Sequence, residues 1–198
     1  MERIEALAKL LKVEVEDLTT SKYDNRVFEN EEAGEYIVLT EEEAYEEAEE
    51  NLKNLVYDLG LELFSKSYQE WILASCIDKE WFDEYLEDYY TNYIDDIRDE
   101  ESAYEGYESR LDEEMNDAGV ETEEEFLDCL IEDAGNSIEW YIDCFGYEEF
   151  KYMCEECDLI DWDSVIEEVI TEDGLANSIA TYDGKEYEVG EYFIYRLS

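Results

Sequence analysis

The residues that could perform chemistry in this chain are five cysteines and a large excess of carboxylates. Cys154 and Cys157 form a C-x-x-C pair, a spacing found in redox motifs and in half of many zinc sites. A redox pair needs a lowered thiol pKa, but two glutamates separate these cysteines and negative neighbours raise it. A zinc site needs further ligands, and the chain offers Cys129 and Cys144 but no His. We interpret the cysteines as buried or partly buried thiols, and a small metal- or thiol-dependent protein using Cys154 and Cys157 remains an alternative.

The carboxylates are too numerous to identify a catalytic pair. The 198 residues include 61 Asp and Glu, 13 Lys and Arg and no His, so the usual general base near neutral pH is missing. A carboxylate pair acts as acid and base only where its two environments differ, and no sequence context distinguishes one pair here. Phosphate-binding loops, nucleophile elbows and dinucleotide fingerprints are also absent from the sequence. We therefore expect a protein that is not an enzyme and that uses no cofactor or metal.

The spacing of the acids along expected helices predicts a surface that binds a partner. In a helix over residues 79–98, an apolar stripe of Phe82, Leu86, Tyr89 (or Tyr90), Tyr93 and Ile97 faces away from acidic positions. Acids four residues apart lie on one helix face about 6 Å from each other, and they form a row of negative charges. A second acidic helix is expected near 100–117. The predicted partner-binding acids are Asp83, Glu84, Glu87, Asp88, Asp95, Asp96, Asp99, Glu100, Glu101, Glu105, Glu108, Asp112, Glu113, Glu114, Asp117, Glu121 and Glu124.

The net charge of −48 limits the class of partner. At one charge per ~1.7 Å, a duplex of roughly 80 Å carries as many charges, whereas a compact chain of this length has a radius of gyration of about 16 Å. Without a basic patch, the chain is not expected to bind nucleic acid or an anionic membrane. Because 15% of the residues are aromatic and 45% hydrophobic, we expect a folded core and not a disordered tail. A basic nucleic-acid-binding protein is the expected partner.

In this combination of small size, extreme acidity, high aromatic content and few basic residues, the chain resembles the DNA-mimic proteins of phages and mobile elements. These include antirestriction and anti-CRISPR proteins, and the resemblance implies occupancy of the nucleic-acid groove of a host defence protein. This resemblance concerns the overall composition and charge of the whole chain, and it rests on no diagnostic motif. Residues 34–40 (GEYIVLT) and 159–184 also look like segments of uncharacterised acidic phage proteins. No functional residue is carried over from either resemblance.

Three alternatives stay open beside this inhibitor. The chain could be an acidic protein–protein adaptor for a basic partner, an allosteric inhibitor whose charge serves only capture, or the thiol or metal protein described above. We expect the protein in the cytoplasm, which is the host cytosol if it is phage-encoded. The sequence shows no signal-peptide core or membrane span, and an odd number of cysteines suits a reducing compartment. A homodimer is compatible with mimicry, because two copies would lengthen the imitated duplex.

The elements that must position these residues predict an α+β fold with a mostly helical middle. We expect residues 1–60 to hold a helix (2–12), a β-hairpin (19–29 and 35–39) and a capped helix to about residue 59. Residues 61–172 should form an acidic helical region, which includes helices opening at Thr122, near 137 and 147, and at 161. Residues 173–198 should form a β-hairpin, in which Asp183-Gly184 joins a strand over 179–182 to the next. The two terminal hairpins echo each other in sequence, either as independent hairpins or as related units of one sheet.

Overall fold

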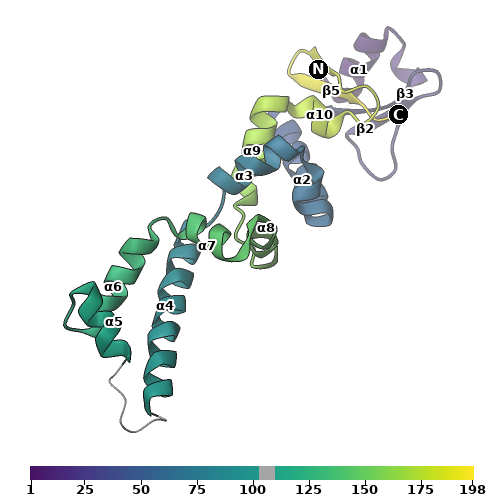
Figure 1. The fold of residues 1–198 in the computed structure, drawn as a ribbon. Coiled ribbons are helices and arrows are strands. Elements are labelled where there is room, and N and C mark those ends of the chain that lie inside the picture. The colour runs from purple at the N-terminus through teal and green to yellow at the C-terminus, as the bar shows by residue number, and fades with distance from the viewer. Residues whose placement is uncertain (103–109) are drawn as a thin grey trace. The chain divides into compact units, whose positions relative to one another are not determined.

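The computed structural model describes the backbone of residues 1–102 and 110–198, and the side chains of residues 1–98 and 110–198 (Figure 1). The chain divides into two compact units. Unit 1 comprises Met1–Gln69 and Asp161–Ser198, and unit 2 comprises Glu70–Ile160. Both ends of the chain therefore belong to the same unit.

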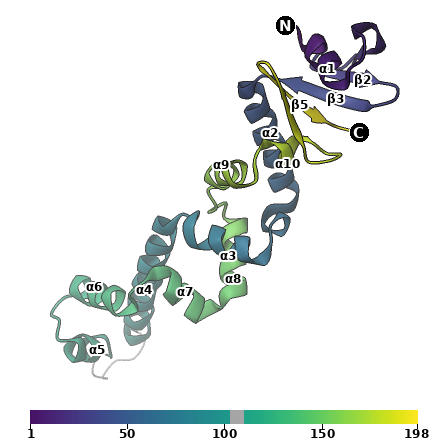
Figure 2. The ribbon, with the colours of Figure 1, turned by 90° about the horizontal axis from the view of Figure 1, so that it is seen from above.

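Unit 1 is built on one five-stranded antiparallel sheet in the order β1-β2-β3-β5-β4 (Figure 2). The strands are β1 (Thr19–Thr20), β2 (Val27–Asn30), β3 (Gly34–Leu39), β4 (Glu186–Val189) and β5 (Tyr192–Arg196). The hairpins near the two ends of the chain meet through β3 and β5, where Val38 pairs with Ile194. The expectation of an α+β fold is thereby confirmed, and of the two arrangements left open for the terminal hairpins the chain adopts the single sheet.

The sequence echo between the two hairpins extends to the turns that precede β2 and β4. In the first, the backbone N–H of Arg26 donates to the Asp24 carboxylate at 2.8 Å, and in the second the N–H of Lys185 donates to Asp183 at 3.1 Å. Both are local turns in which an aspartate holds the backbone two residues further on. Val38 and Ile194 occupy equivalent positions in the two hairpins, so the sheet is centred on this pair.

Helices lie against both faces of the sheet. Because successive strand residues point to opposite faces, Tyr36, Val38 and Ile194 face helix α1 (Arg3–Leu11) and form a buried cluster with Leu7. Helix α2 (Glu41–Leu59) lies near β3 and β5 and buries Ala44, Ala48, Leu52 and Val56. The other helical segments of unit 1 are η1 (Val15–Asp17), η2 (Gly60–Leu63), α9 (Trp162–Asp173) and α10 (Leu175–Ile179). The unit boundary falls within α3 (Lys66–Ser75).

Unit 2 is helical in its described residues. Its helices are α4 (Lys79–Ser102), α5 (Arg110–Ala118), α6 (Glu123–Ala134), α7 (Ser137–Phe145) and α8 (Tyr147–Glu156). Phe82 of α4 is 1% exposed, and its ring centroid lies 5.3 Å from those of both Tyr141 and Phe150. The two ends of the unit meet where Asp78 donates a backbone hydrogen bond of 2.8 Å to Leu159. An aromatic core thus holds α4, α7 and α8 together.

The capped helices follow the sequence closely. Thr40 and Glu43 form the expected capping box at the start of α2, and Thr122 and Glu125 form the one that opens α6. Gly60 and Gly135 end these two helices. Local sequence signals therefore fix these boundaries before any tertiary contact is considered.

Two strand predictions were wrong. Residues 175–179 form helix α10 in place of the start of a strand over 179–182, and the Gly184 N–H donates back to Ala180 at 3.1 Å. Asp183-Gly184 is thus a turn that precedes β4, and the hairpin itself turns at Gly190, where φ is +72°. The expected strand over 19–29 is divided into β1 and β2 by the Asp24 turn. Burial of Ile179 against the helical layer decides the first case, because an isolated turn signal does not specify where the strands begin.

The described parts of the acidic helix expected near 100–117 belong to two helices. Helix α4 continues to Ser102, and α5 begins at Arg110. Residues 103–109 lie outside the described chain. Among the described residues, no helix combines the length and the apolar character that a membrane span requires.

Candidate protein-binding surface

The predicted acids are carried by three helices that one small apolar cluster holds together. Ile94 and Ile97 of α4, Leu111 of α5 and Phe126 of α6 are each at most 5% exposed and pack against one another. Burying these side chains fixes which faces of the three helices turn outward. The 3.6-residue period of each helix then directs its acids to solvent.

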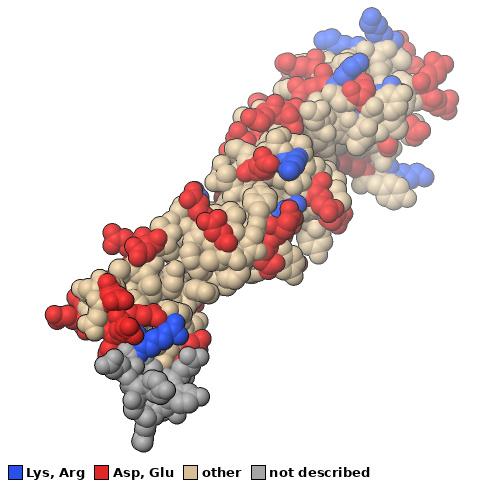
Figure 3. All heavy atoms as spheres, in the orientation of Figure 1, with Lys and Arg blue, Asp and Glu red and all other residues tan. Residues whose placement is uncertain are grey.

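Eleven of the twelve predicted acids whose side chains are described are exposed, and Glu114 is half-buried. The exposed ones are Asp83, Glu84, Glu87, Asp88, Asp95, Asp96, Asp112, Glu113, Asp117, Glu121 and Glu124. Asp99, Glu100 and Glu101 belong to α4, but their side chains lie outside the described part of the chain. Glu105 and Glu108 lie outside it with both backbone and side chain. Figure 3 shows acidic side chains gathered over α5 and α6 in the view of Figure 1.

A few of these acids serve the structure of unit 2. Asp83 accepts a 2.6 Å hydrogen bond from the hydroxyl of Ser137, which joins α4 to α7. Glu114 accepts a hydrogen bond of 2.8 Å from the hydroxyl of Tyr93 and one of 2.8 Å from Arg110. Burial raises the pKa of the Tyr93 hydroxyl, and the neighbouring Glu114 carboxylate raises it further. Asp83 and Glu114 are therefore less available to a partner than their sequence positions suggested.

Arg98 of α4 and Arg110 of α5 are already paired with carboxylates. Arg98 forms ion pairs with Asp95 at 2.6 Å and with Glu123, and Arg110 pairs with Glu114. In the described part of the chain, no hydrogen bond or ion pair engages the side chains of Glu84, Glu87, Asp88, Asp96, Glu113, Asp117, Glu121 and Glu124. Over its full sequence, unit 2 has 32 acidic and 4 basic residues in 91 positions, a net charge of −28. Most of the carboxylate charge therefore faces solvent uncompensated.

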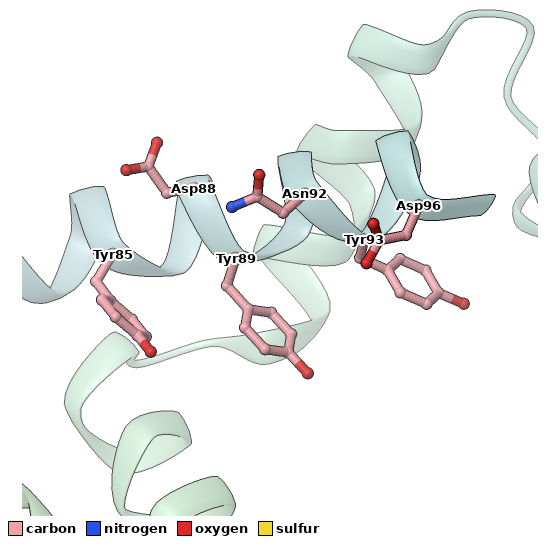
Figure 4. Close-up of a pocket in the computed structure, with 6 residues that line it drawn as sticks. All are labelled: Tyr85, Asp88, Tyr89, Asn92, Tyr93 and Asp96. Carbon is pink, nitrogen blue, oxygen red and sulfur yellow. The ribbon is translucent and has the colours of Figure 1, made fainter. Parts of the chain in front are cut away.

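A hollow beside this acidic face was not predicted from the sequence. It encloses about 380 Å³ on one side of α4, and we call it the tyrosine hollow (Figure 4). Its lining residues are Tyr85, Asp88, Tyr89, Asn92, Tyr93 and Asp96. The sequence placed Tyr89 or Tyr90 in the buried stripe of this helix, but Tyr89 is 43% exposed and Tyr90 is half-buried. The recurrence of tyrosine at 85, 89 and 93 is the signal that could have revealed a second, aromatic row.

The expectation of buried or partly buried thiols holds for Cys76, Cys129 and Cys154 and is wrong for Cys144 and Cys157, which are exposed. Cys154 is fully buried in α8, and burial raises the pKa of its thiol to about 12, with further contributions from Glu155 and Cys157. Cys157 caps the end of the same helix and is exposed. Among the described residues, no group of three or more Cys, Asp and Glu side chains could hold a metal ion. A raised thiol pKa is the opposite of what a redox-active C-x-x-C pair requires.

No family model matches this chain, and no curated protein or solved structure shows significant similarity to it. The surface must therefore be interpreted from its own geometry and charge.

Proposed function

We propose that this protein is an acidic DNA mimic, not an enzyme, that occupies the nucleic-acid-binding groove of a host defence protein in the host cytosol. A CRISPR effector or a restriction enzyme is the class of target. The observation that carries the proposal is the set of exposed, unpaired carboxylates on α4, α5 and α6, within a unit of net charge −28. A redox pair of Cys154 and Cys157 is less well supported, because burial raises the pKa of the Cys154 thiol.

The charge density of unit 2 is sufficient for mimicry. Helix α4 has 24 residues and is about 36 Å long at 1.5 Å per residue. A duplex of that length carries about 21 phosphate charges, fewer than the net charge of unit 2. The Lys and Arg side chains of a groove that neutralise DNA phosphates could therefore find a similar number of carboxylates on such a surface.

Capture and retention would depend on different side chains. Long-range attraction between the carboxylates and a basic groove raises the association rate, and added salt screens it. Aromatic side chains exposed beside the acids supply the close contacts that slow dissociation. Tyr89, Tyr147 and Tyr152 of unit 2 are each more than 40% exposed and suit this role.

The test is affinity capture from a bacterial lysate at low and high salt, with duplex DNA used as a competitor for elution. Mimicry predicts recovery of a nuclease or other DNA-binding protein that is released both by added duplex and by about 0.5 M salt. A captured partner that still binds duplex while attached would contradict mimicry and indicate an adaptor or an allosteric inhibitor. Capture that is unchanged between low and high salt would also count against the proposal.

A further inference from the structure

We propose that the tyrosine hollow on α4 binds arginine side chains of the partner. This inference rests on the proposed function in that the partner is a basic protein, and it identifies which side chain is recognised and where. The hollow is distinct from the acidic rows, since it combines three aromatic rings with two carboxylates and one amide. Its volume of about 380 Å³ is at the lower end for a ligand pocket, which suits side chains better than a duplex-sized ligand.

The six lining residues occupy one face of the helix. At 100° per residue, Tyr85, Tyr89 and Tyr93 form one row, and Asp88, Asn92 and Asp96 form a second row beside it, so that together they span about 140° of the helix circumference. Figure 4 shows the rings of Tyr85 and Tyr89 on one side of α4, with the side chains of Asp88 and Asn92 on the other side in that view. Of the two carboxylates, Asp96 therefore lies closer to the tyrosine row, whereas Asp88 lies at the opposite edge of this face.

The three tyrosines are held in place by neighbours within unit 2. The Tyr85 ring stacks on Trp81 at 5.2 Å, and the Tyr89 ring meets Trp140 edge-on at 4.9 Å. The Tyr93 hydroxyl is anchored to Glu114 at 2.8 Å. Side chains that are already ordered lose little conformational entropy when a ligand binds, so the aromatic row is prepared for contact.

The carboxylates of the hollow lack a cation. Asp88 and Asp96 are exposed, and within the described residues no ion pair engages either of them. Arg98, the basic residue nearest to Asp96 in sequence, already pairs with Asp95 and Glu123. Because Asp88 and Asp96 are eight residues apart, about 12 Å along the helix, they can serve two separate cations and not one.

Arginine fits this arrangement better than lysine. A planar guanidinium stacks on an aromatic face and donates two hydrogen bonds to a carboxylate, whereas an ammonium group acts as a point charge. The chain uses the same pairing internally: the Arg196 guanidinium lies 3.9 Å from the Tyr182 ring centroid. At the end of the hollow, Arg110 donates to the Tyr93 hydroxyl at 3.3 Å and to Glu114 at 2.8 Å.

The inference is tested with two synthetic peptides on the full-length protein. One carries three arginines separated by pairs of glycines, and the other carries lysine at the same positions. Affinities are measured by fluorescence anisotropy at about 0.15 M salt, where the Debye length of about 8 Å limits long-range attraction. We expect the arginine peptide to bind about five times more tightly than the lysine peptide.

Variants then locate the site. Tyr89→Leu, which keeps an apolar side chain but removes the ring, should weaken arginine-peptide binding about five- to tenfold and abolish the preference for arginine, while Tyr89→Phe should change it less than about twofold. Asp88→Asn combined with Asp96→Asn should weaken binding about tenfold. The matched control combines Asp133→Asn with Asp143→Asn, which changes the net charge equally at exposed positions of unit 2 outside the hollow, and its effect should stay below about twofold.

Equal affinity of the native protein for the two peptides would overturn the inference. So would losses in the hollow variants that merely match the charge control. Neither result depends on DNA competition, so the proposed mimicry would survive both. Conversely, an arginine preference that maps to the hollow, together with a partner that duplex DNA fails to displace, would refute mimicry and leave the hollow as an arginine-binding site.

Discussion

The two units of this protein differ in how far basic residues balance their acidic residues. Unit 1 has 29 acidic and 9 basic residues in 107 positions, a net charge of −20, whereas unit 2 reaches −28 in 91 positions. In unit 1, Arg26 donates to the carboxylate of Asp24 at 2.7 Å and lies 2.9 Å from Glu47. Side-chain hydrogen bonding to Arg26 lowers the pKa of Asp24. Arg98 likewise pairs with Glu123 within unit 2, but that unit has one basic residue for every 8 acids, whereas unit 1 has one for about every 3.

In unit 2, acidic residues lower the stability of the fold, and most of those whose side chains are described form no ion pair that would offset this effect. Acids spaced four residues apart on a helix repel each other by a few tenths of a kcal/mol per pair. Unit 2 offsets that repulsion with its aromatic core and the small cluster around Phe126. A function that needs the charge is the simplest reason for such an arrangement to exist.

Removing the Phe126 side chain should cause the largest difference in stability between the two units. Phe126→Ala deletes a ring that is 4% exposed and joins α6 to α4, so we expect unit 2 to lose about 3–5 kcal/mol of unfolding free energy. Urea unfolding followed by ¹⁹F NMR of fluorotryptophan separates the units, because Trp71, Trp81 and Trp140 belong to unit 2 and Trp162 to unit 1.

The control for that experiment is Phe145→Ala, also in unit 2. The Phe145 side chain is 41% exposed, so it should cost about 1 kcal/mol or less. A comparable loss in the two variants would show that the cluster around Phe126 does not hold the acidic helices in place.

Alkaline pH should destabilise unit 2 before unit 1. The pKa of Cys154 rises from 9.0 to about 12 through burial, so the folded state keeps the thiol protonated while the unfolded state ionises above pH 9. Stability is therefore complete below pH 9, falls by about 1.4 kcal/mol at pH 10 and continues to fall towards pH 12. In unit 1, burial likewise raises the pKa of Tyr195 above its ordinary value of 10.0, so the corresponding loss begins about one pH unit higher.

The same four tryptophan resonances measure this order of unfolding as a function of pH. Cys154→Ala should remove the steep dependence of unit 2 between pH 9 and pH 10, whereas Cys144→Ala, at an exposed position, should retain it. Simultaneous loss of both units in the native protein from pH 9 upward would contradict the assignment.

Charge-matched variants test whether mimicry belongs to unit 2. Changing Glu84, Glu87, Glu113 and Asp117 to their amides raises the net charge by four, as does changing Glu46, Glu50, Glu167 and Glu172 in unit 1. We expect the first set to reduce capture of the partner about tenfold at low salt and the second to reduce it about twofold, because only the first removes charges at the proposed contact. Equal losses would mean that the total charge of the protein matters and its distribution does not.

Salt should have the smallest effect, and it should stabilise unit 2 by screening the repulsion between its acids. All five cysteines belong to unit 2, and Cys154 is fully buried, so its rate of reaction with a thiol reagent reports the opening of this unit. Raising sodium chloride from about 0.01 M to 0.5 M screens the repulsion and should slow Cys154 labelling about fivefold. Faster labelling in salt would show that repulsion between the acids does not limit the stability of unit 2.

The sequence by itself determined the features of this protein that depend on neighbouring residues. The Thr40 and Thr122 capping boxes, the glycines that end those helices and the outward direction of the acids of α4 all follow from local spacing. The α+β class and the echo between the two hairpins could be predicted for the same reason.

Only the tertiary structure decided which of several locally acceptable arrangements the chain adopts. Periodicity could not distinguish the half-buried from the exposed tyrosines of α4, because Trp140 packs against Tyr89 from a different helix and still leaves that ring exposed. Nor could it show that Asp83 is engaged by Ser137, or that β3 and β5 join the two ends of the chain in one sheet. These contacts link residues distant in sequence, and their free energy depends on burial and geometry that no local pattern contains.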